Sequence, residues 1–422
     1  MSESGMRGVD VARAGEASLD PDGLRRAFGL LEGWIDDGIL PGAAAIVTRG
    51  GRVAGEAYLG VANRANGQSV SSDTIWSLAS VTKPFTATAV MLLVERGALS
   101  LDDPVHRLVP EFLDAPPTAF DRRLVTLRHL LAHCSGLPGF SPDNDLLRQE
   151  HRPLEDFVRS FGRQPLYFAP GAYHLYSNPG ILMAAEVVGR ALAGHLGVET
   201  QPPLVGRYHR FVEEEILGPL GMTLSALHPP GAWDDRIARV ERTGQEGLDW
   251  EGANSAYYRS LGIPWGGMFS RPRDLVRFVD LFLPAAGGRQ RVGFERAGAV
   301  DPPRIVSPAT VRQMTSVQFA PPDAPTDLAP ELRDLAARTP PRPAVEWGIG
   351  WEVKGIKRPH PSGELTSMAT YSHLGATGTL VWADPLADLA CVLLTNRTLV
   401  SGWAVERPRQ ALFSNAVMAA VR

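Results

Sequence analysis

Residues 74–97 read TIWSLASVTKPFTATAVMLLVERG and place Ser80 and Lys83 three positions apart at the start of an apolar helical pattern. Pro84 is tolerated in the first turn of a helix, so we expect the helix to begin near Ser80. Residues three apart lie on one helix face, so Lys83 can contact the Ser80 hydroxyl. A lysine buried there can lose its proton near neutral pH and act as a base, whereas an exposed lysine is only a solvated charge.

The two ends of the chain carry strand patterns. Gly50-Gly51 can supply the positive φ of a two-residue hairpin, so residues 43–49 and 52–59 are expected to pair as antiparallel strands. Further strands are expected near the other end of the chain, followed by a closing helix. These segments are residues 349–356, 378–383 and 389–395 for the strands and 408–421 for the helix.

Helical patterns dominate the middle of the chain. Asp20 and Pro21 predict the start of a first helix, which ends near Gly38. We predict an α+β fold, in which an antiparallel sheet formed by both chain ends is flanked by helices and a mostly helical domain is inserted. The expected inserted helices are 84–96, 126–132, 180–193 and 271–283, and the expected units are a flexible tail (1–18), a sheet domain (19–76 plus 346–422) and a helical domain (77–345).

Two long segments of the predicted helical domain, residues 225–260 and 285–345, lack both helical and strand patterns. Long ordered loops in enzymes are often lids or pocket walls. Disordered insertions are the alternative interpretation of these segments.

The composition excludes several classes of protein. With 44% hydrophobic and 21% charged residues, the chain is neither disordered nor collagen-like. Forty-two basic and 46 acidic residues, with no basic cluster, predict no nucleic-acid partner. No apolar run has the ~18 residues of a membrane span and no signal sequence is recognised, so we expect a cytoplasmic protein without a membrane partner. Cys134 and Cys391 are expected to be reduced, partly buried thiols.

A second candidate for chemistry is Tyr176-Ser177-Asn178, which follows a loop rich in Pro and Gly and precedes an apolar helix. Such a loop can project a phenol, which can relay a proton, and an amide, which both donates and accepts hydrogen bonds. Taken alone, the pattern is common, and a turn with Asn178 beside Pro179 is the simpler interpretation.

A third candidate is His373-Leu374-Gly375, at an expected strand start. Gly375 would let a substrate approach the strand edge, and the following N–H of Ala376 can donate to an oxyanion beside the His373 ring. Lone histidines are more often structural, and His133 is expected to anchor a turn. The signatures of α/β-hydrolases, zincins, P-loop proteins and Rossmann proteins are all absent from the sequence.

Ser80-x-x-Lys83, Tyr176-x-Asn178 and His373-x-Gly375, in this order, resemble the three motifs of the serine β-lactamase and penicillin-binding-protein superfamily. The sequence is most similar to class C-like β-lactamases, family VIII carboxylesterases and D-alanyl-D-alanine carboxypeptidase-like hydrolases. Other segments share the resemblance, which extends over residues 20–420. They are LLAHCSGLPGF (130–140), EEEILGPLGMT (213–223), WGGMFSRPRDLVRF (265–278) and WGIGW (347–351).

The resemblance implies a fold of the β-lactamase/transpeptidase type and a role for each motif. Ser80 would attack an ester or amide carbonyl and form an acyl-enzyme. Lys83 and Tyr176 would share the proton transfers, and Asn178 would hold Lys83 or a substrate amide. The backbone N–H groups of Ser80 and Ala376 would form the oxyanion hole. No metal or organic cofactor is implied.

Two positions depart from the family pattern. Cys134 stands where threonine is usual, which should affect only the turn, and His373 replaces the lysine typical of β-lactamases. A histidine is largely neutral at pH 7 and lacks the fixed positive charge that would pair with a β-lactam carboxylate.

We therefore expect a serine hydrolase of the carboxylesterase type, whose partner is a small ester or amide substrate. The alternatives are a D-amino-acid peptidase or amidase, a β-lactamase, an acyltransferase and a non-catalytic binding protein of the same fold. The sequence sets no oligomeric state. Several aromatic residues near the motifs could line an apolar acyl pocket, namely Trp76, Phe140, Tyr173, Trp265 and Trp347.

Overall fold

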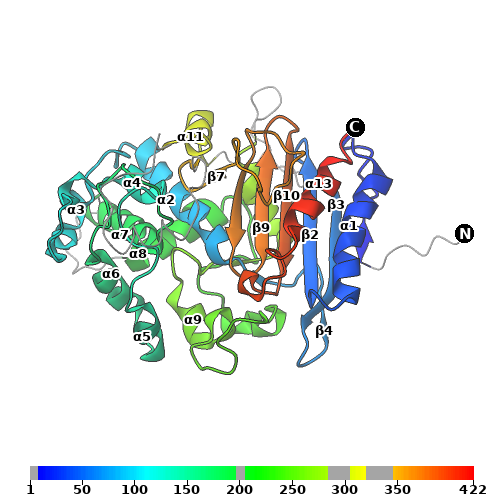
Figure 1. The fold of residues 1–422 in the computed structure, drawn as a ribbon, viewed down its shortest axis with the longest axis horizontal. Coiled ribbons are helices and arrows are strands. Elements are labelled where there is room, and N and C mark those ends of the chain that lie inside the picture. Colours follow the sequence, from blue (N-terminus) through cyan, green and yellow to red (C-terminus); the bar gives the residue numbers. More distant parts are fainter. Residues whose placement is uncertain (1–7, 196–204, 284–304, 320–345) are drawn as a thin grey trace, which may run out of the picture.

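An antiparallel sheet lies between α1 (Pro21–Asp36) and α13 (Arg409–Met418) on one side and the larger group of helices on the other, as the computed structural model shows (Figure 1). The structure describes residues 8–195, 205–283, 305–319 and 346–422. None of the described helices is both long enough and apolar enough to cross a membrane.

The sheet joins strands from the two ends of the chain. Strands β2 (Gly42–Arg49) and β3 (Arg52–Asn63) form the expected hairpin, and Gly50 and Gly51 both have positive φ. β2 also pairs along its length with β10 (Leu389–Thr395), so the centre of the sheet joins distant parts of the sequence. The order is β1-β3-β2-β10-β9-β8-β7, with β4 beside β3. The other strands are β1 (Val9–Asp10), β4 (Gln68–Ser69), β7 (Glu352–Val353), β8 (Tyr371–Gly375) and β9 (Thr379–Asp384), and β5 (Trp76–Ser77) pairs separately with β6 (Phe269–Ser270).

Two helices from opposite chain ends lie side by side on the sheet (Figure 1). They are α1 and α13. The side chain of Asp20 accepts a hydrogen bond from Gly23 N at 2.9 Å, which confirms the predicted N-cap. Phe28 and Phe413 pack with ring centroids 6.4 Å apart, so the helices bury an apolar layer against the sheet.

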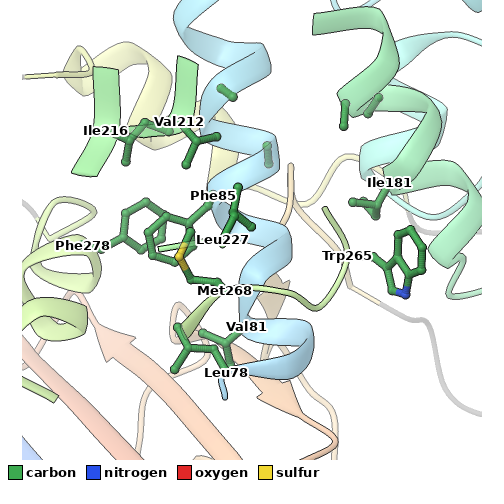
Figure 2. Packing of buried hydrophobic residues seen from close by; sticks show 14 of the residues in the cluster. Leu78, Val81, Phe85, Ile181, Val212, Ile216, Leu227, Trp265, Met268 and Phe278 are labelled. Carbon is green, nitrogen blue, oxygen red and sulfur yellow. The ribbon is translucent and has the colours of Figure 1, made fainter. Parts of the chain in front are cut away.

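The helical side is built around α2 (Lys83–Glu95), which is buried over most of its length. Phe85 of α2 stacks on Phe278 with centroids 3.7 Å apart, and Met268 packs below this pair (Figure 2). A helix surrounded by apolar neighbours has its position fixed by close packing. The other helices are α3 (Val105–Leu108), α4 (Leu127–Leu131), α5 (Asn144–Gln149), α6 (Leu154–Gly162), α7 (Asn178–His195), α8 (Val205–Val212), α9 (Ala256–Leu261), α10 (Pro272–Asp280) and α11 (Pro308–Met314).

The predicted α+β fold, with a sheet from both chain ends and flanking helices, is confirmed. Two local predictions were wrong. Residues 8–18 are not a free tail, because β1 pairs with β3 and small apolar residues such as Ala14 are buried against the sheet. The strand expected over 349–356 is reduced to β7, because Gly350 and Gly355 adopt positive φ and interrupt the extended backbone.

The segment 225–260 is an ordered wall, and it contains short 3₁₀ turns and the start of α9. Isolated bridges join Ile237 to Ile75 and Glu241 to Arg397, so the segment contacts residues from both ends of the chain. Most of the other long loop, residues 284–304 and 320–345, lies outside the described residues, and α11 occupies the part between them. The division of the chain into separate sheet and helical domains stays a prediction.

Candidate active site

Ser80 lies in the 3₁₀ turn Ala79–Thr82, which leads directly into α2. Ala79 has a φ of +46°, a strained conformation for a residue with a Cβ. Thr82 Oγ1 donates to the Ala79 carbonyl at 2.6 Å and accepts from Met268 N at 3.0 Å. The turn that presents Ser80 is therefore held by its own side chains and by the segment that packs beneath it. The α-helix begins at Lys83, one residue before the predicted range of 84–96, and the residues from Ala79 to Thr82 form a 3₁₀ turn.

Lys83 is fully buried and its amine has two oxygen neighbours. Nζ donates to Ser80 Oγ at 2.9 Å and to the Trp265 carbonyl at 2.8 Å. Burial lowers the pKa of Lys83 well below its usual value of 10.5, because the charged form loses its hydration. A neutral amine at this distance has a lone pair available for the Ser80 proton.

The carbonyl that binds Lys83 belongs to a loop tied to α2 and α8. Thr86, one turn after Lys83, donates from Oγ1 to the Pro264 carbonyl at 2.7 Å. Tyr208 OH of α8 lies 2.7 Å from the same Oγ1. All three polar groups lie inside the packed helical core, where such hydrogen bonds fix geometry. The position of the Trp265 carbonyl is therefore set by groups that do not touch Ser80.

Tyr176 lies two residues before α7 and Asn178 is the first residue of that helix. The Lys83 Nζ lies 4.6 Å from the centre of the Tyr176 ring. Burial raises the pKa of Tyr176, and a hydrogen bond with Ser80 opposes that rise, so the phenol keeps its proton. Asn178 N donates to the Gly139 carbonyl at 3.1 Å. Asn178 Oδ1 is buried and has no hydrogen-bond partner among the described residues, so it can accept one from a substrate.

His373 lies within β8, two residues after the strand begins. Its Nδ1–H donates to the Leu374 carbonyl at 2.9 Å, and Nε2 is buried without a partner in the described part of the chain. Burial, with a smaller contribution from Lys83, lowers the pKa of His373 to about 3. The ring centre lies 6.2 Å from that of Tyr176, so the second and third motifs meet. His373 is thus a neutral polar group beside the tyrosine.

Gly375 brings the end of β8 against the turn that carries Ser80. A Cβ at this position would lie 2.0 Å from Thr379 Oγ1 and 2.3 Å from the Leu78 carbonyl, so only glycine fits. Thr379 Oγ1 also donates to the Leu78 carbonyl at 3.0 Å. These contacts place the turn containing Ala376 next to the segment that enters Ser80, as an oxyanion hole of the two N–H groups requires.

Sequence reasoning underestimated His133, which was expected only to anchor a turn. It has a φ of +57°, and its Nδ1 accepts from Ser177 N at 3.1 Å. Its ring lies 4.4 Å from that of Tyr176 and 4.9 Å from that of Trp347. Trp347 in turn lies 5.8 Å from His373. His133 therefore connects the loop after α4 to the Tyr176 motif. Its position in the segment LLAHCSGLPGF was the sequence feature that could have indicated this role.

The five aromatic residues expected to line an acyl pocket are dispersed. Trp76 and Trp265 are buried in the helical core, and Tyr173 packs on a neighbouring phenylalanine. Only Trp347, beside Tyr176, and Phe140, which is 59% exposed, have surroundings that suit a substrate pocket. Aromatic residues close in sequence to a motif often belong to the core, so the acyl pocket stays a prediction.

Comparison with known proteins agrees with this geometry. A model of the family described as Beta-lactamase matches residues 29–414, so the chain belongs to the β-lactamase family of serine hydrolases. Esterase EstB from Burkholderia gladioli is 30% identical over 374 residues, which cover 85% of this chain and 86% of EstB. A putative D-alanyl-D-alanine carboxypeptidase of Escherichia coli O157:H7 is 25% identical over 404 residues, covering 87% and 81% of the two chains.

Among solved structures, EstCE1, described as a hydrolase with promiscuous acyltransferase activity, superposes with a TM-score of 0.68. The match covers 94% of this chain and 99% of EstCE1 at 21% identity. At that identity the likeness concerns the fold, and it confirms the β-lactamase/transpeptidase-like architecture. In the described part of the chain, no group of three His, Cys, Asp or Glu side chains is arranged to hold a metal ion.

Proposed function

We propose that the protein is a carboxylesterase that hydrolyses small esters through an acyl-enzyme on Ser80. The observation that carries this proposal is the 2.9 Å contact between the buried Lys83 amine and Ser80 Oγ. A base within hydrogen-bond distance of a serine is the arrangement that activates a hydroxyl nucleophile.

The mechanism follows from the protonation states of the two neighbours of Ser80. Lys83 takes the hydroxyl proton, and Oγ forms a bond to the ester carbonyl carbon while the N–H groups of Ser80 and Ala376 bind the oxyanion. Tyr176, whose pKa is raised by burial, gives its proton to the departing alcohol as the ester C–O bond breaks. The proton on Lys83 returns to Tyr176, and water then cleaves the acyl-enzyme by the same transfers in reverse order.

An ester is preferred to a β-lactam because of His373. Its low pKa makes it neutral throughout the physiological range, so it offers a β-lactam carboxylate no fixed positive charge. The similarity to esterase EstB supports the same choice.

A second candidate activity is hydrolysis of D-alanyl peptides. It is favoured by the similarity to the putative carboxypeptidase of Escherichia coli over 87% of this chain. Peptide and ester hydrolysis would use the same acyl-enzyme, so the difference lies in the leaving group that Tyr176 must protonate.

A parallel panel of p-nitrophenyl acetate and butyrate, a chromogenic cephalosporin and a D-alanyl-D-alanine peptide tests the proposal. We expect the short esters to have the highest kcat/KM and Ser80→Ala to abolish their turnover. Adding methanol and measuring methyl ester formation separates acyl transfer from hydrolysis. A higher kcat/KM for the peptide or the cephalosporin would contradict the carboxylesterase assignment.

A further inference from the structure

A cavity of about 350 Å³ opens next to the residues that follow Gly139. Its wall comes from the loop after His133, from α5 and from the ordered segment 225–260. The lining residues are Phe140, Ser141, Pro142, Asn144, Asp145, Arg148 and Gln245. A volume of this size suits part of a small molecule.

The first connection between the cavity and the candidate active site runs through Gly139. This residue precedes Phe140, and its carbonyl accepts the N–H of Asn178 at 3.1 Å. A Cβ on Gly139 would lie 3.2 Å from the Tyr176 carbonyl. The rim of the cavity is therefore continuous with the segment that carries the second motif.

The second connection runs through Tyr258 of α9. The Arg148 guanidinium lies 5.2 Å from the centre of the Tyr258 ring, and Tyr258 OH donates to the Gly266 carbonyl at 3.2 Å. A Cβ on Gly266 would lie 3.8 Å from Ala79, the residue before Ser80. A single aromatic ring thus separates Arg148 from the backbone that packs against the Ser80 turn.

The polar groups of the cavity include both donors and acceptors, and Asn144 Oδ1 is a buried acceptor without a partner among the described residues. Arg148 Nε is a buried donor without a hydrogen-bond partner among the described residues. The Asp145 carboxylate already accepts from Asn144 Nδ2 at 2.9 Å. The Gln245 carbonyl oxygen accepts from Gly252 N at 3.3 Å, which leaves its amide N–H groups as donors. A guanidinium beside an amide donor matches a planar carboxylate.

Arg148 differs in this respect from the arginine one turn along the chain. Arg152 pairs with Asp156 at 2.6 Å and does not line the cavity. Closer to Ser80, Lys83 and His373 are both driven toward their neutral forms by burial. Among the residues that line the cavity, Arg148 is the basic side chain and Asp145 is the acidic one.

We propose that the cavity is a substrate subsite for a carboxylate, with Arg148 as its anchor, and that the preferred esters carry an anionic group at one end. The proposal rests on the ester hydrolysis proposed above. It names the class of substrate, which is a half-ester of a dicarboxylic acid or the ester of a hydroxy acid.

Matched ester pairs test the subsite. In one arm, monomethyl adipate and suberate are compared with methyl hexanoate and octanoate. In the other, 6-acetoxyhexanoate is compared with hexyl acetate. We expect kcat/KM for the carboxylate member to exceed that of its neutral counterpart by ~10-fold or more in one arm, which also shows which end of the ester enters the cavity. The ratio should fall as NaCl is raised.

Three variants assign the preference to a side chain. Arg148→Gln should bring the ratio of the two kcat/KM values close to one. Arg148→Lys should retain part of the preference, because the lysine ammonium is still a positive point charge. Arg152→Gln removes the same charge outside the cavity and should keep the full ratio. Circular dichroism and thermal unfolding verify that each variant is folded.

The outcomes separate the two proposals. If neutral esters are hydrolysed and neither arm favours the carboxylate, the subsite is wrong and the esterase proposal stands. If no ester is hydrolysed, the esterase proposal fails. The subsite proposal is then tested by measuring ligand binding. In that case, isothermal titration of monomethyl suberate into Ser80→Ala protein should show binding that Arg148→Gln abolishes. Equal binding by the two proteins, or none by either, would overturn the subsite.

Discussion

The Thr86 hydroxyl donates to the Pro264 carbonyl at 2.7 Å, one peptide unit before the carbonyl that accepts Lys83 Nζ. Because a hydroxyl has one proton, Tyr208 OH, 2.7 Å away, is the donor in its own contact with Thr86. The chain Tyr208 to Thr86 to Pro264 therefore positions the acceptor of the candidate base without touching the reacting atoms.

Replacing Thr86 by Val should lower kcat about 10-fold, because the Trp265 carbonyl loses its support. A less well placed acceptor stabilises the Lys83 ammonium less, so the pKa of Lys83 should fall further and the acid limb of the pH profile should shift to lower pH. Thr86→Ser should restore both values. Thr88 is equally buried on the same helix but bonds to Pro84 O, so Thr88→Val should leave the limb in place. If Thr86→Val loses activity but the acid limb of its pH profile does not shift, Thr86 has only a structural role.

The pH profile of kcat/KM tests the state of Lys83 in the unaltered protein. If the free amine is the base, activity falls as the pH drops through the pKa of Lys83 in the folded enzyme. Burial lowers that pKa, so the limb should lie well below 10.5. His373, with a pKa of about 3, should add no limb near 6.5, and His373→Gln should keep the profile unchanged in shape. A limb close to 10 would show that Lys83 is solvated.

A fluorophosphonate should label one residue, Ser80. Intact-mass and peptide mass spectrometry measure the adduct. Ser177 is the informative control, because it is buried, donates to Pro138 O at 2.7 Å and accepts from Gly180 N at 3.1 Å. Ser177→Ala should keep the label, whereas Ser80→Ala should lose it. Modification of Ser177 in protein with an unlabelled Ser80 would reject the assignment of the nucleophile.

Lys83→Ala and Tyr176→Phe should each lower kcat by ~10²–10⁴, because both groups serve one proton transfer path. The double variant should lose far less than the product of the single losses, since groups that act as a unit are not additive. Steady-state kinetics on p-nitrophenyl butyrate provides the comparison. Multiplicative losses would mean that the two residues act independently.

His373→Lys should narrow the gap between esters and β-lactams by improving cephalosporin hydrolysis. The substitution adds a positive charge beside Tyr176, where a β-lactam carboxylate would otherwise lack a cationic partner. The measurement is the ratio of kcat/KM for a cephalosporin to that for p-nitrophenyl butyrate. If the ratio is unchanged in a folded variant, His373 does not determine the choice between esters and β-lactams.

Local sequence signals predicted those parts of the fold and of the candidate site that depend on neighbouring residues, but not contacts between distant segments. Gly50-Gly51, the Asp20 cap and the Ser80 motif each depend on neighbouring residues, so they could be identified without the structure. Arg148 and Tyr258 could not, because their contact joins α5 to α9 across more than a hundred residues and neither lies in a motif. Trp76 and Trp265 lie in the core although they are close to the motifs, since proximity in the sequence does not determine which way a ring points.

The pairing of β2 with β10 also constrains when the enzyme can become active during synthesis. The hairpin of β2 and β3 leaves the ribosome early, as does Ser80, but the partner strand of β2 begins at Leu389. Until that strand emerges, one edge of the hairpin is an unpaired template open to other chains. The turn after β8, which would complete the oxyanion hole, is also translated late. A nascent chain with a complete Ser80 and Lys83 pair should therefore hydrolyse nothing, and the edge of its hairpin is open to pairing with other chains.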